Sequence, residues 1–259
     1  MSSPTMWSAG RYEAVARRIA HIAGEVIDAV ERRRPLAGTA LLDLACGTGN
    51  AALTAAARGA QVTGVDITPD LIAIASRHDG DAAVDWRTGD ASDTGLPAAS
   101  FDAVVSNMGI IFVEPDRQVA EVDRVLRGGG VFAFSSWVRD THNPLFDPVV
   151  EVLGPPARSG FSPDQWGDPD TITDRLAPGY DAIDIRRSRH SWEFESLSAA
   201  MHFLREESPM HVETFRRVDG AQAERLAAAF EAALREHVDA SGTVTFTSPY
   251  VVVSALRRT

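Results

Sequence analysis

The sequence predicts an α/β fold whose sheet is doubly wound and mostly parallel, and three observations lead to this prediction. Short apolar runs alternate with amphipathic or alanine-rich stretches, roughly every 20–30 residues, from residue 11 to residue 137. Three of these runs end at a glycine or an aspartate, where ligands bind in open parallel sheets. The 259 residues, 44% apolar and 24% charged, have the composition of a globular protein.

The first elements follow from periodicity and from helix-ending residues. Apolar residues recur every three or four positions over 11–33, which predicts one amphipathic helix. A buried strand is predicted over 40–45, and an alanine-rich helix over 50–58 ends at Gly59. The next expected elements are a strand at 61–65, a helix at 68–78, strands at 83–87 and 101–106, a helix at 115–126 ended by Gly128–Gly130, and a strand at 131–137.

The alternation breaks after Trp137. The stretch 140–180 is rich in proline and predicts irregular structure with short helices. The final part of the chain has two strand-like segments, 183–194 and 243–256, and two expected helices, 197–206 and 220–238. These two strands bring the expected total to seven.

The charge and the cysteine content of the chain limit which partners and compartments are expected. The chain has 25 basic and 36 acidic residues, a net charge of −11, which disfavours a nucleic-acid partner. The arginine-rich runs 32–34 and 186–189 are interpreted as solvated faces. A single cysteine, Cys46, allows no intrachain disulfide and fits a reducing compartment. We find no apolar run of signal-peptide or membrane-span length, so the sequence predicts a soluble, cytoplasmic protein.

A glycine loop and two acidic strand ends are the informative motif. Gly47 and Gly49, with Ala52, satisfy the dinucleotide-binding pattern, although a simple strand-to-helix turn has the same appearance. Asp66 ends the next strand, where a carboxylate can accept hydrogen bonds from both ribose hydroxyls. Asp90 follows the third strand and can accept from an exocyclic amine such as that of adenine.

Taken in order, these segments resemble the class I S-adenosylmethionine-dependent methyltransferases. The matching residues are Leu42-Asp43-Leu44-Ala45-Cys46-Gly47-Thr48-Gly49, Val65-Asp66-Ile67-Thr68, Gly89-Asp90-Ala91, Leu96-Pro97, Ser100-Phe101-Asp102 and Arg124-Val125-Leu126-Arg127-Gly128-Gly129-Gly130. The likeness covers residues 5–138 and is nearest to the small-molecule branch that includes ubiquinone and menaquinone C-methyltransferases. It implies a Rossmann-like, seven-stranded methyltransferase fold, S-adenosyl-L-methionine as cofactor and S-adenosyl-L-homocysteine as product.

Carried over by position, the resemblance implies cofactor contacts at each strand end. Gly47 and Gly49 would pass under the methionine and ribose, with Ala45 where many members have glycine; alanine fits there if its φ is negative. The remaining implied roles are Asp43 near the sulfonium and amino end, Asp66 at the ribose hydroxyls, Ile67 on an adenine face, Asp90 and Ala91 at the adenine edge, Asn107 and Met108 between cofactor and acceptor, and Tyr12 at the methionine carboxylate.

The resemblance also suggests how the chain divides. Residues 1–38 would form an N-terminal helical lid and 39–138 the cofactor-binding core. Residues 139–259 would supply the variable substrate and lid region, together with the last two strands of the same sheet. A lid excludes water from the transferred group.

The chemistry expected is in-line displacement of a methyl group onto a small-molecule acceptor, which needs alignment and, for a protonated nucleophile, a base. His142 is the candidate base, although a lone loop histidine is more often simply exposed. No His, Cys and carboxylate cluster has metal-ligand spacing, so no metal is predicted. Two alternatives stay open: a nicotinamide-dependent oxidoreductase, and an S-adenosylmethionine-binding protein without transfer activity. The acceptor atom and the oligomeric state are not predicted.

Overall fold

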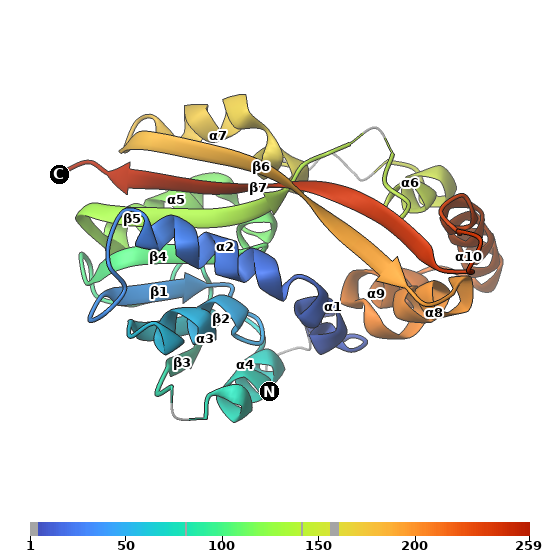
Figure 1. Cartoon of the computed structure of the whole chain (residues 1–259), viewed down its shortest axis with the longest axis horizontal. Coiled ribbons are helices and arrows are strands. Elements are labelled where there is room, and N and C mark those ends of the chain that lie inside the picture. Colours follow the sequence, from blue (N-terminus) through green and yellow to red (C-terminus); the bar gives the residue numbers. More distant parts are fainter. Residues whose placement is uncertain (1–4, 81, 141, 156–160) are drawn as a thin grey trace. The chain divides into compact units, whose positions relative to one another are not determined.

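The computed structural model describes residues 5–80, 82–140, 142–155 and 161–259, and its centre is one seven-stranded sheet (Figure 1). The strand order is β3-β2-β1-β4-β5-β7-β6. The strands are β1 (Ala40–Leu44), β2 (Gln61–Asp66), β3 (Asp85–Thr88), β4 (Phe101–Asn107), β5 (Leu126–Trp137), β6 (Tyr180–Phe194) and β7 (Val244–Arg257). Strands β3, β2, β1, β4 and β5 pair in parallel, whereas β7 is antiparallel to β5. The predicted mostly parallel, seven-stranded sheet is thereby confirmed.

The helices fall between these strands and in the segments outside them. They are α1 (Tyr12–Arg18), α2 (Ala20–Glu31), α3 (Asn50–Ala57), α4 (Pro69–His78), α5 (Pro115–Val125), α6 (Asp147–Leu153), α7 (Pro169–Leu176), α8 (Leu197–His202), α9 (Pro209–Arg217) and α10 (Gly220–Arg235). A π-helical turn, Phe203–Glu207, follows α8, and short 3₁₀ turns lie at Met6–Ser8, Ile110–Phe112 and Pro163–Gly167.

The chain forms two compact units, each assembled from separate segments. The sheet unit comprises residues 19–139, 161–188 and 250–259, and the helical unit comprises 1–18, 140–160 and 189–249. Each unit contains segments from more than one of the three parts expected from the sequence. The strands β1 to β5 lie in the sheet unit, so the predicted glycine loop and acidic strand ends lie there too.

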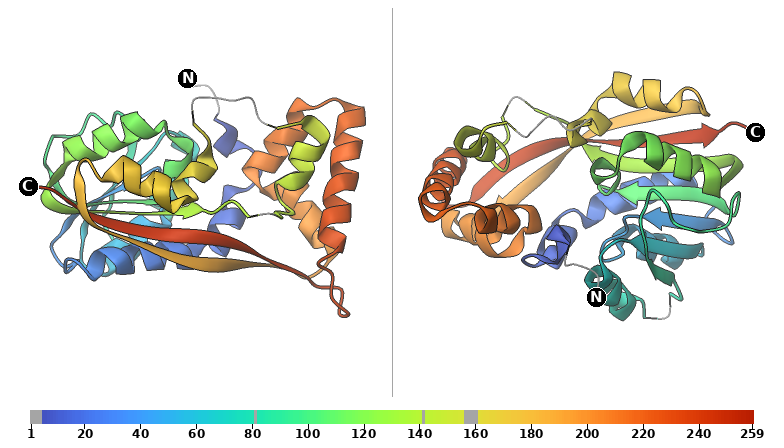
Figure 2. Two further views of the ribbon diagram at one scale, coloured as in Figure 1. Left: turned by 90° about the horizontal axis from the view of Figure 1, so that it is seen from above. Right: turned by 180° about the vertical axis from the view of Figure 1, so that it is seen from behind.

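The sheet unit has helices on both faces of the sheet. Helices α2 and α3 cover one face, and α5 and α7 cover the other (Figure 2). Its core is a continuous apolar cluster in which Phe134 meets Trp166 edge to face, with ring centroids 5.2 Å apart. Leu42 and Val104, from adjacent parallel strands, are fully buried in this cluster. Burial of both faces explains why these strands read as continuous apolar runs.

The helical unit has an aromatic core of its own. The Trp192 ring stacks on that of Phe246, with centroids 6.3 Å apart, and both residues are 5% exposed. The Arg18 guanidinium lies 4.7 Å from the Phe203 ring centroid and 5.0 Å from that of Phe194, in a cation–π arrangement. Residues far apart in sequence therefore hold this unit together.

Two helix boundaries differ clearly from the sequence prediction, and one helix was not predicted. The single helix expected over 11–33 is interrupted at Ile19, which has φ −102° and ψ 9°, and its two parts belong to different units. Helix α5 ends at Val125 because Leu126 is extended and pairs with Phe101; the triplet Gly128–Gly130 therefore lies inside β5 rather than ending the helix. Helix α9 was not predicted.

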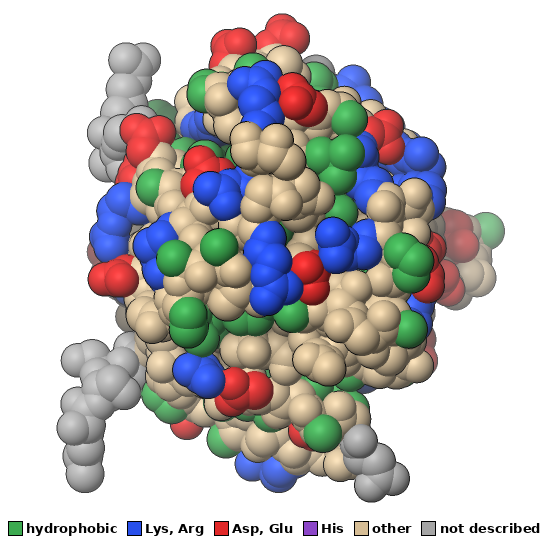
Figure 3. All heavy atoms as spheres, turned by 90° about the vertical axis from the view of Figure 1, so that its left-hand side faces the viewer, with side chains coloured by type: hydrophobic (Ala, Val, Ile, Leu, Met, Phe, Trp, Pro, Cys, Tyr) green, Lys and Arg blue, Asp and Glu red, His purple; other side chains and the backbone are tan. Residues whose placement is uncertain are grey.

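The face of the molecule seen in Figure 3 carries arginine and acidic side chains interspersed. Near the amino ends of β1, β4 and β5, Asp102 forms ion pairs with Arg34 at 3.1 Å and with Arg127 at 2.8 Å.

In the part of the chain that the structure describes, no helix combines the length and the apolar character needed to cross a membrane.

Candidate active site

The loop that joins β1 to α3 turns sharply through residues in the left-handed region. Gly47 has φ 57° and Gly49 has φ 90°, and the Gly49 amide donates to the Cys46 carbonyl at 2.9 Å. A Cβ atom on Gly49 would lie 2.5 Å from the Trp86 ring. Both the conformation and the neighbouring indole therefore require glycine here.

Ala45 also lies in this loop, and it does not have the negative φ that was stated as the condition for an alanine to fit here. Its φ is 52°, and the residue that follows β4, Met108, is likewise left-handed at 57°. A Cβ atom on Gly109 would lie 2.6 Å from the Ala45 Cβ, so the absent side chain of Gly109 gives the alanine methyl its space. A left-handed L-residue costs roughly 1–2 kcal/mol, and such strain concentrates at functional sites.

Asp66 is the last residue of β2 and is 6% exposed. Its Oδ2 accepts from the Gly47 amide at 2.9 Å, and its Oδ1 accepts from the Thr68 amide at 2.8 Å. Burial raises the pKa of this carboxyl, while the two amide hydrogen bonds oppose the rise. Because each carboxylate oxygen has a further lone pair, Asp66 is oriented by the loop and can still accept from ligand hydroxyls.

Asp43 lies in β1 and is 1% exposed. Its Oδ2 accepts from the Ala52 amide in the first turn of α3 at 2.9 Å, whereas its buried Oδ1 has no hydrogen-bond partner among the described residues. Burial raises the pKa of Asp43 to about 8; the Ala52 amide opposes this rise and the nearby Asp66 adds to it. A buried carboxyl oxygen without a partner is unfavourable, so this position fits a cationic or N–H-bearing ligand group.

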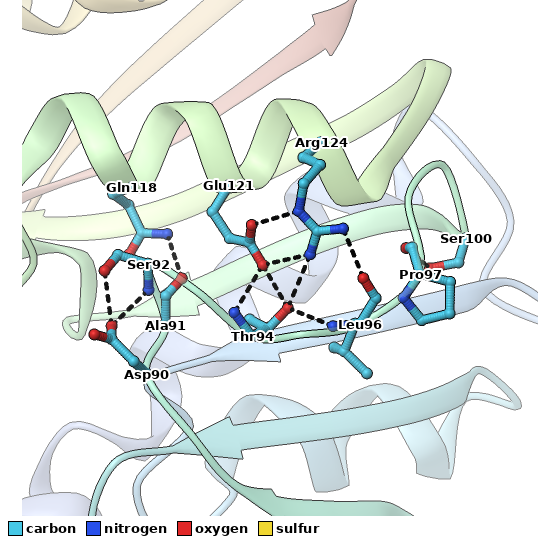
Figure 4. A network of polar contacts seen from close by, with 10 residues as sticks. All are labelled: Asp90, Ala91, Ser92, Thr94, Leu96, Pro97, Ser100, Gln118, Glu121 and Arg124. Atoms are coloured by element: carbon cyan, nitrogen blue, oxygen red, sulfur yellow. Dashed lines mark hydrogen bonds and ion pairs between the residues drawn. The ribbon is translucent and has the colours of Figure 1, made fainter.

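Asp90 follows β3, and its side chain is 46% exposed. One oxygen, Oδ1, accepts from the backbone amide and the hydroxyl of Ser92, both at 2.8 Å (Figure 4). The other, Oδ2, lies 4.0 Å from the Arg117 guanidinium. Ala91 is 6% exposed, and its carbonyl accepts from the Gln118 side chain of α5 at 3.1 Å. One Asp90 oxygen is thus committed to the turn, and the other faces more open surroundings.

The ends of β2 and β4 supply the remaining predicted positions. Ile67, directly after Asp66, is 54% exposed, which is unusual for a large apolar side chain. Asn107 ends β4, and the Ser135 hydroxyl in β5 donates to its Oδ1 at 2.8 Å. The same hydroxyl accepts from the Met108 amide at 3.0 Å, which holds the strained turn.

Parallel pairing brings these strand ends to one edge of the sheet. The predicted residues that lie along this edge of the sheet unit are Asp43, Ala45, Gly47, Gly49, Asp66, Ile67, Asp90, Ala91, Asn107 and Met108. Their chemistry is rich in acceptors: two buried carboxyls, one exposed carboxyl and a left-handed glycine loop. This combination fits a ligand that has hydroxyl groups, an amine and a positive charge.

Comparison with known proteins identifies the family. A family model described as "Methyltransferase domain" matches residues 42–134. An uncharacterized protein of Mycobacterium bovis is 30% identical over 189 residues, which cover 70% of this chain and 67% of that protein. A ubiquinone/menaquinone biosynthesis C-methyltransferase of Rubrivivax gelatinosus is 36% identical over 132 residues, 48% of this chain and 52% of the relative. The chain belongs to the class I S-adenosylmethionine-dependent methyltransferases.

The fold of this methyltransferase has close counterparts among solved structures. The YcgJ protein of Bacillus subtilis superposes with a TM-score of 0.60 at 16% identity, over 92% of this chain and 99% of that one. At this identity the likeness concerns the fold. The family favours the methyltransferase reading over the nicotinamide-dependent oxidoreductase that the glycine loop also allowed.

Two predicted site residues of the methyltransferase, Tyr12 and His142, belong to the helical unit. The Tyr12 ring, in α1, meets the Trp7 ring edge to face at 6.1 Å. His142 is exposed, and the side chain of its neighbour Asn143 accepts from the Leu145 amide at 3.0 Å. The roles of Tyr12 and His142 stay predictions. Within the described ranges, no group of three or more His, Cys, Asp or Glu residues is arranged to hold a metal ion.

Sequence reasoning missed residues that support the edge from a distance. Gln118 and Ser135 form hydrogen bonds with it across 27 residues of sequence. Gly109 has no side chain and so leaves space for the Ala45 methyl group. For Gln118, an available signal was a polar residue on the apolar face of a predicted helix. Cys46 is buried, and burial, with Asp43 and Asp66 nearby, raises the pKa of its thiol, which suits a space-filling role.

Proposed function

We propose that this methyltransferase transfers a methyl group to a small-molecule acceptor, with its cofactor lying across the carboxyl ends of β1, β2 and β3. The observation that carries the proposal is the pair of buried carboxyls. Asp66 is oriented by two amides, and Asp43 keeps one buried oxygen without a partner in the described structure. A cofactor with two ribose hydroxyls, an ammonium group and a sulfonium supplies partners for both.

The adenosyl half would be held by the ends of β2 and β3. Asp66 accepts from the ribose hydroxyls, and the exposed Ile67 side chain covers one face of the adenine. Asp90 offers its Oδ2 to the adenine amine, because its Oδ1 already accepts twice from Ser92. Ala91 lines the ring edge. In these assignments, each side chain binds the cofactor through an atom or a surface that is not already used within the protein.

The methionine half would be held by the glycine loop and the start of α3. Gly47 and Gly49 let the main chain approach the ligand closely, with Ala45 at the same turn. Asp43 pairs with the cationic end, and Tyr12 reaches the carboxylate. When bound, S-adenosylmethionine supplies an electrophilic methyl group on sulfur. Asn107 and Met108 then line the path toward the acceptor, held by Ser135.

Two features support a small-molecule acceptor. The Rubrivivax gelatinosus relative is a C-methyltransferase of ubiquinone/menaquinone biosynthesis, and it matches 48% of this chain. The segment Ser106-Asn107-Met108-Gly109 lacks the Asn-Pro-Pro-Tyr type of motif found in enzymes that methylate amines of nucleic-acid bases. We therefore favour an aromatic or isoprenoid acceptor over a macromolecule.

The test is transfer of radiolabel from S-adenosylmethionine to short-chain demethylated quinols, in parallel with bulk tRNA and a protein extract. We expect label in the solvent-extracted quinol and none in the macromolecules. Label confined to tRNA or protein would contradict the small-molecule proposal. Absence of S-adenosylhomocysteine binding would contradict the proposed cofactor site itself.

His142 is the proposed base if the acceptor is a hydroxyl. A positioned base contributes about 10²–10⁴-fold in rate, whereas a carbon or pre-ionised acceptor needs alignment alone. We expect His142→Ala to lower kcat more than about a hundredfold with cofactor affinity unchanged. The matched control is His78→Ala, at the end of α4. A loss below about threefold would show that His142 is an ordinary loop residue.

A further inference from the structure

The loop that follows β3 is held from one side by α5. Three polar side chains of this helix, Gln118, Glu121 and Arg124, bond to the loop, at positions spaced three apart on one helical face (Figure 4). The predicted amphipathic helix would place apolar side chains on a buried face. Two of these three residues are instead polar and buried, which indicates a specific structural task.

Gln118 contacts the loop at its first residues. Its side chain is 1% exposed, and its Nε2 donates to the Ala91 carbonyl at 3.1 Å. This contact fixes the orientation of the amide, because a flipped amide would set Oε1 against the carbonyl oxygen. In that orientation Oε1 is buried and has no partner among the described residues.

The peptide bond between Ala91 and Ser92 is therefore held at both ends. Gln118 binds its carbonyl, and the Asp90 Oδ1 accepts from its N–H at 2.8 Å. Because the peptide is planar, these two bonds fix both the course of the main chain at Ala91 and the direction of the Asp90 carboxylate. The other oxygen of Asp90, Oδ2, which lies 4.0 Å from the Arg117 guanidinium, is consequently presented in a defined direction.

Glu121 and Arg124 hold the remainder of the loop. Glu121 is 5% exposed and accepts from the Thr94 amide at 2.8 Å and from the Thr94 hydroxyl. Arg124 donates through Nε to Glu121 at 2.7 Å and through Nη1 to the Leu96 carbonyl at 2.7 Å. A buried carboxylate with all its partners supplied is rigid, so the loop has little freedom beyond Ser92.

We propose that Gln118 is a positioning residue for adenine recognition: by holding the Ala91–Ser92 peptide, it aims the Asp90 carboxylate at the exocyclic amine of the cofactor. The inference rests on the proposed function, which assigns Asp90 and Ala91 to the adenine. A carboxylate that is 46% exposed gains little from a flexible contact, since water competes for it. Because Gln118 holds the Asp90 carboxylate in place before the ligand binds, less conformational entropy is lost on binding, and the carboxylate can select for the amine.

The experiment compares two ligands that differ at the adenine amine. S-adenosylhomocysteine carries the amine, and S-inosylhomocysteine carries a carbonyl oxygen in its place. We expect the wild-type protein to bind S-adenosylhomocysteine about fivefold more tightly than S-inosylhomocysteine by calorimetry. Gln118→Met, which keeps the length of the side chain but has no N–H, should reduce this ratio to about two. Its affinity for S-inosylhomocysteine should stay unchanged, which a general loss of structure would not allow.

Two further variants complete the test. Gln118→Glu replaces the donor with an acceptor, so it should lose the same selectivity and provides a second measurement if Gln118→Met does not fold. Asp116→Asn, exposed on the same helix, is the control and should keep the wild-type ratio. A wild-type ratio retained in both Gln118 variants would overturn the inference while the proposed cofactor site stands. Failure of the wild type to bind either ligand would overturn the proposed function as well.

Discussion

The carboxyl edge of the sheet holds its acidic residues in two different ways. At the ends of β1 and β2, Asp43 and Asp66 are buried and bonded to amides of the adjoining loops and of α3. After β3, Asp90 is half-exposed. Its loop is held by hydrogen bonds from α5 side chains that lie 27 residues away in the chain. The first region is organised by the turn itself, and the second by a remote scaffold.

This difference assigns different tasks to the two regions. A buried carboxyl without its full set of partners gains strongly when a ligand supplies them, so the β1–β2 region is expected to provide most of the affinity. An exposed carboxylate competes with water and contributes less energy. Held in a fixed direction, it contributes selectivity instead. Substitutions at Asp66, Asp43 and Asp90 test this difference.

The largest effect is expected for Asp66→Ala. The substitution removes a charged acceptor shared by two ligand hydroxyls, and such bonds contribute roughly 1.5–3 kcal/mol each. We expect the affinity for S-adenosylhomocysteine to fall at least about tenfold by calorimetry, with a cooperative unfolding transition retained. Asp85→Ala, at the exposed start of β3, is the matched control. An unchanged affinity in Asp66→Ala would show that Asp66 does not bind the ribose hydroxyls.

Asp43 is expected to make the stability of the free protein depend on pH. Burial raises its pKa to about 8, whereas an aspartate of the unfolded chain titrates near 4. Between these values the folded state keeps a proton that the unfolded state has lost. The stabilising contribution is therefore fully present below about pH 4 and is lost as the pH rises to about 8.

Because of Asp43, the free energy of unfolding should fall by up to about 1.4 kcal/mol per pH unit in this range. The raised pKa of Asp66 acts in the same direction. Urea unfolding between about pH 5 and pH 8 measures this pH dependence. Asp43→Asn keeps the shape of the side chain and removes the titration, so its stability should vary less steeply with pH. Equal slopes in the two proteins would show that Asp43 is ionised in the free protein.

The smallest effect is expected for Asp90→Ala. An exposed acceptor contributes about 0.5–1 kcal/mol, so the affinity for S-adenosylhomocysteine should fall about two- to fivefold. The preference over S-inosylhomocysteine should disappear at the same time. A loss as large as that of Asp66→Ala would abolish the distinction between the two regions.

The same contrast explains what the sequence could predict. Asp43 and Asp66 lie in the last residues of their strands and Gly47 in the loop after β1, so local sequence patterns located them and the sheet edge. The support given by Ser135 and Gln118 spans 27 residues in each case, and no local pattern reports such a contact. The left-handed Ala45 was missed because its space depends on the absent side chain of another loop.

The fold shows a similar division. Strands buried on both faces were predicted in order, because continuous apolar runs and glycine stops depend on neighbouring residues. The break at Ile19 was missed because the apolar periodicity continues through it while the two halves join different units. Helix α9 lies in the helical unit, whose packing depends on residues from three separate segments.

Hydrogen–deuterium exchange with and without S-adenosylhomocysteine measures where on the sheet the cofactor binds. The cofactor is proposed to lie on the loops after β1, β2 and β3, whose amides include those of Gly47 and Thr68. We predict protection on binding in peptides that span 45–52, 66–70 and 89–94. The amino ends of β4 and β5, at the opposite edge of the same sheet, should stay unchanged. Protection at those amino ends, with none in the three loops, would show that the cofactor does not bind at the carboxyl edge of the sheet.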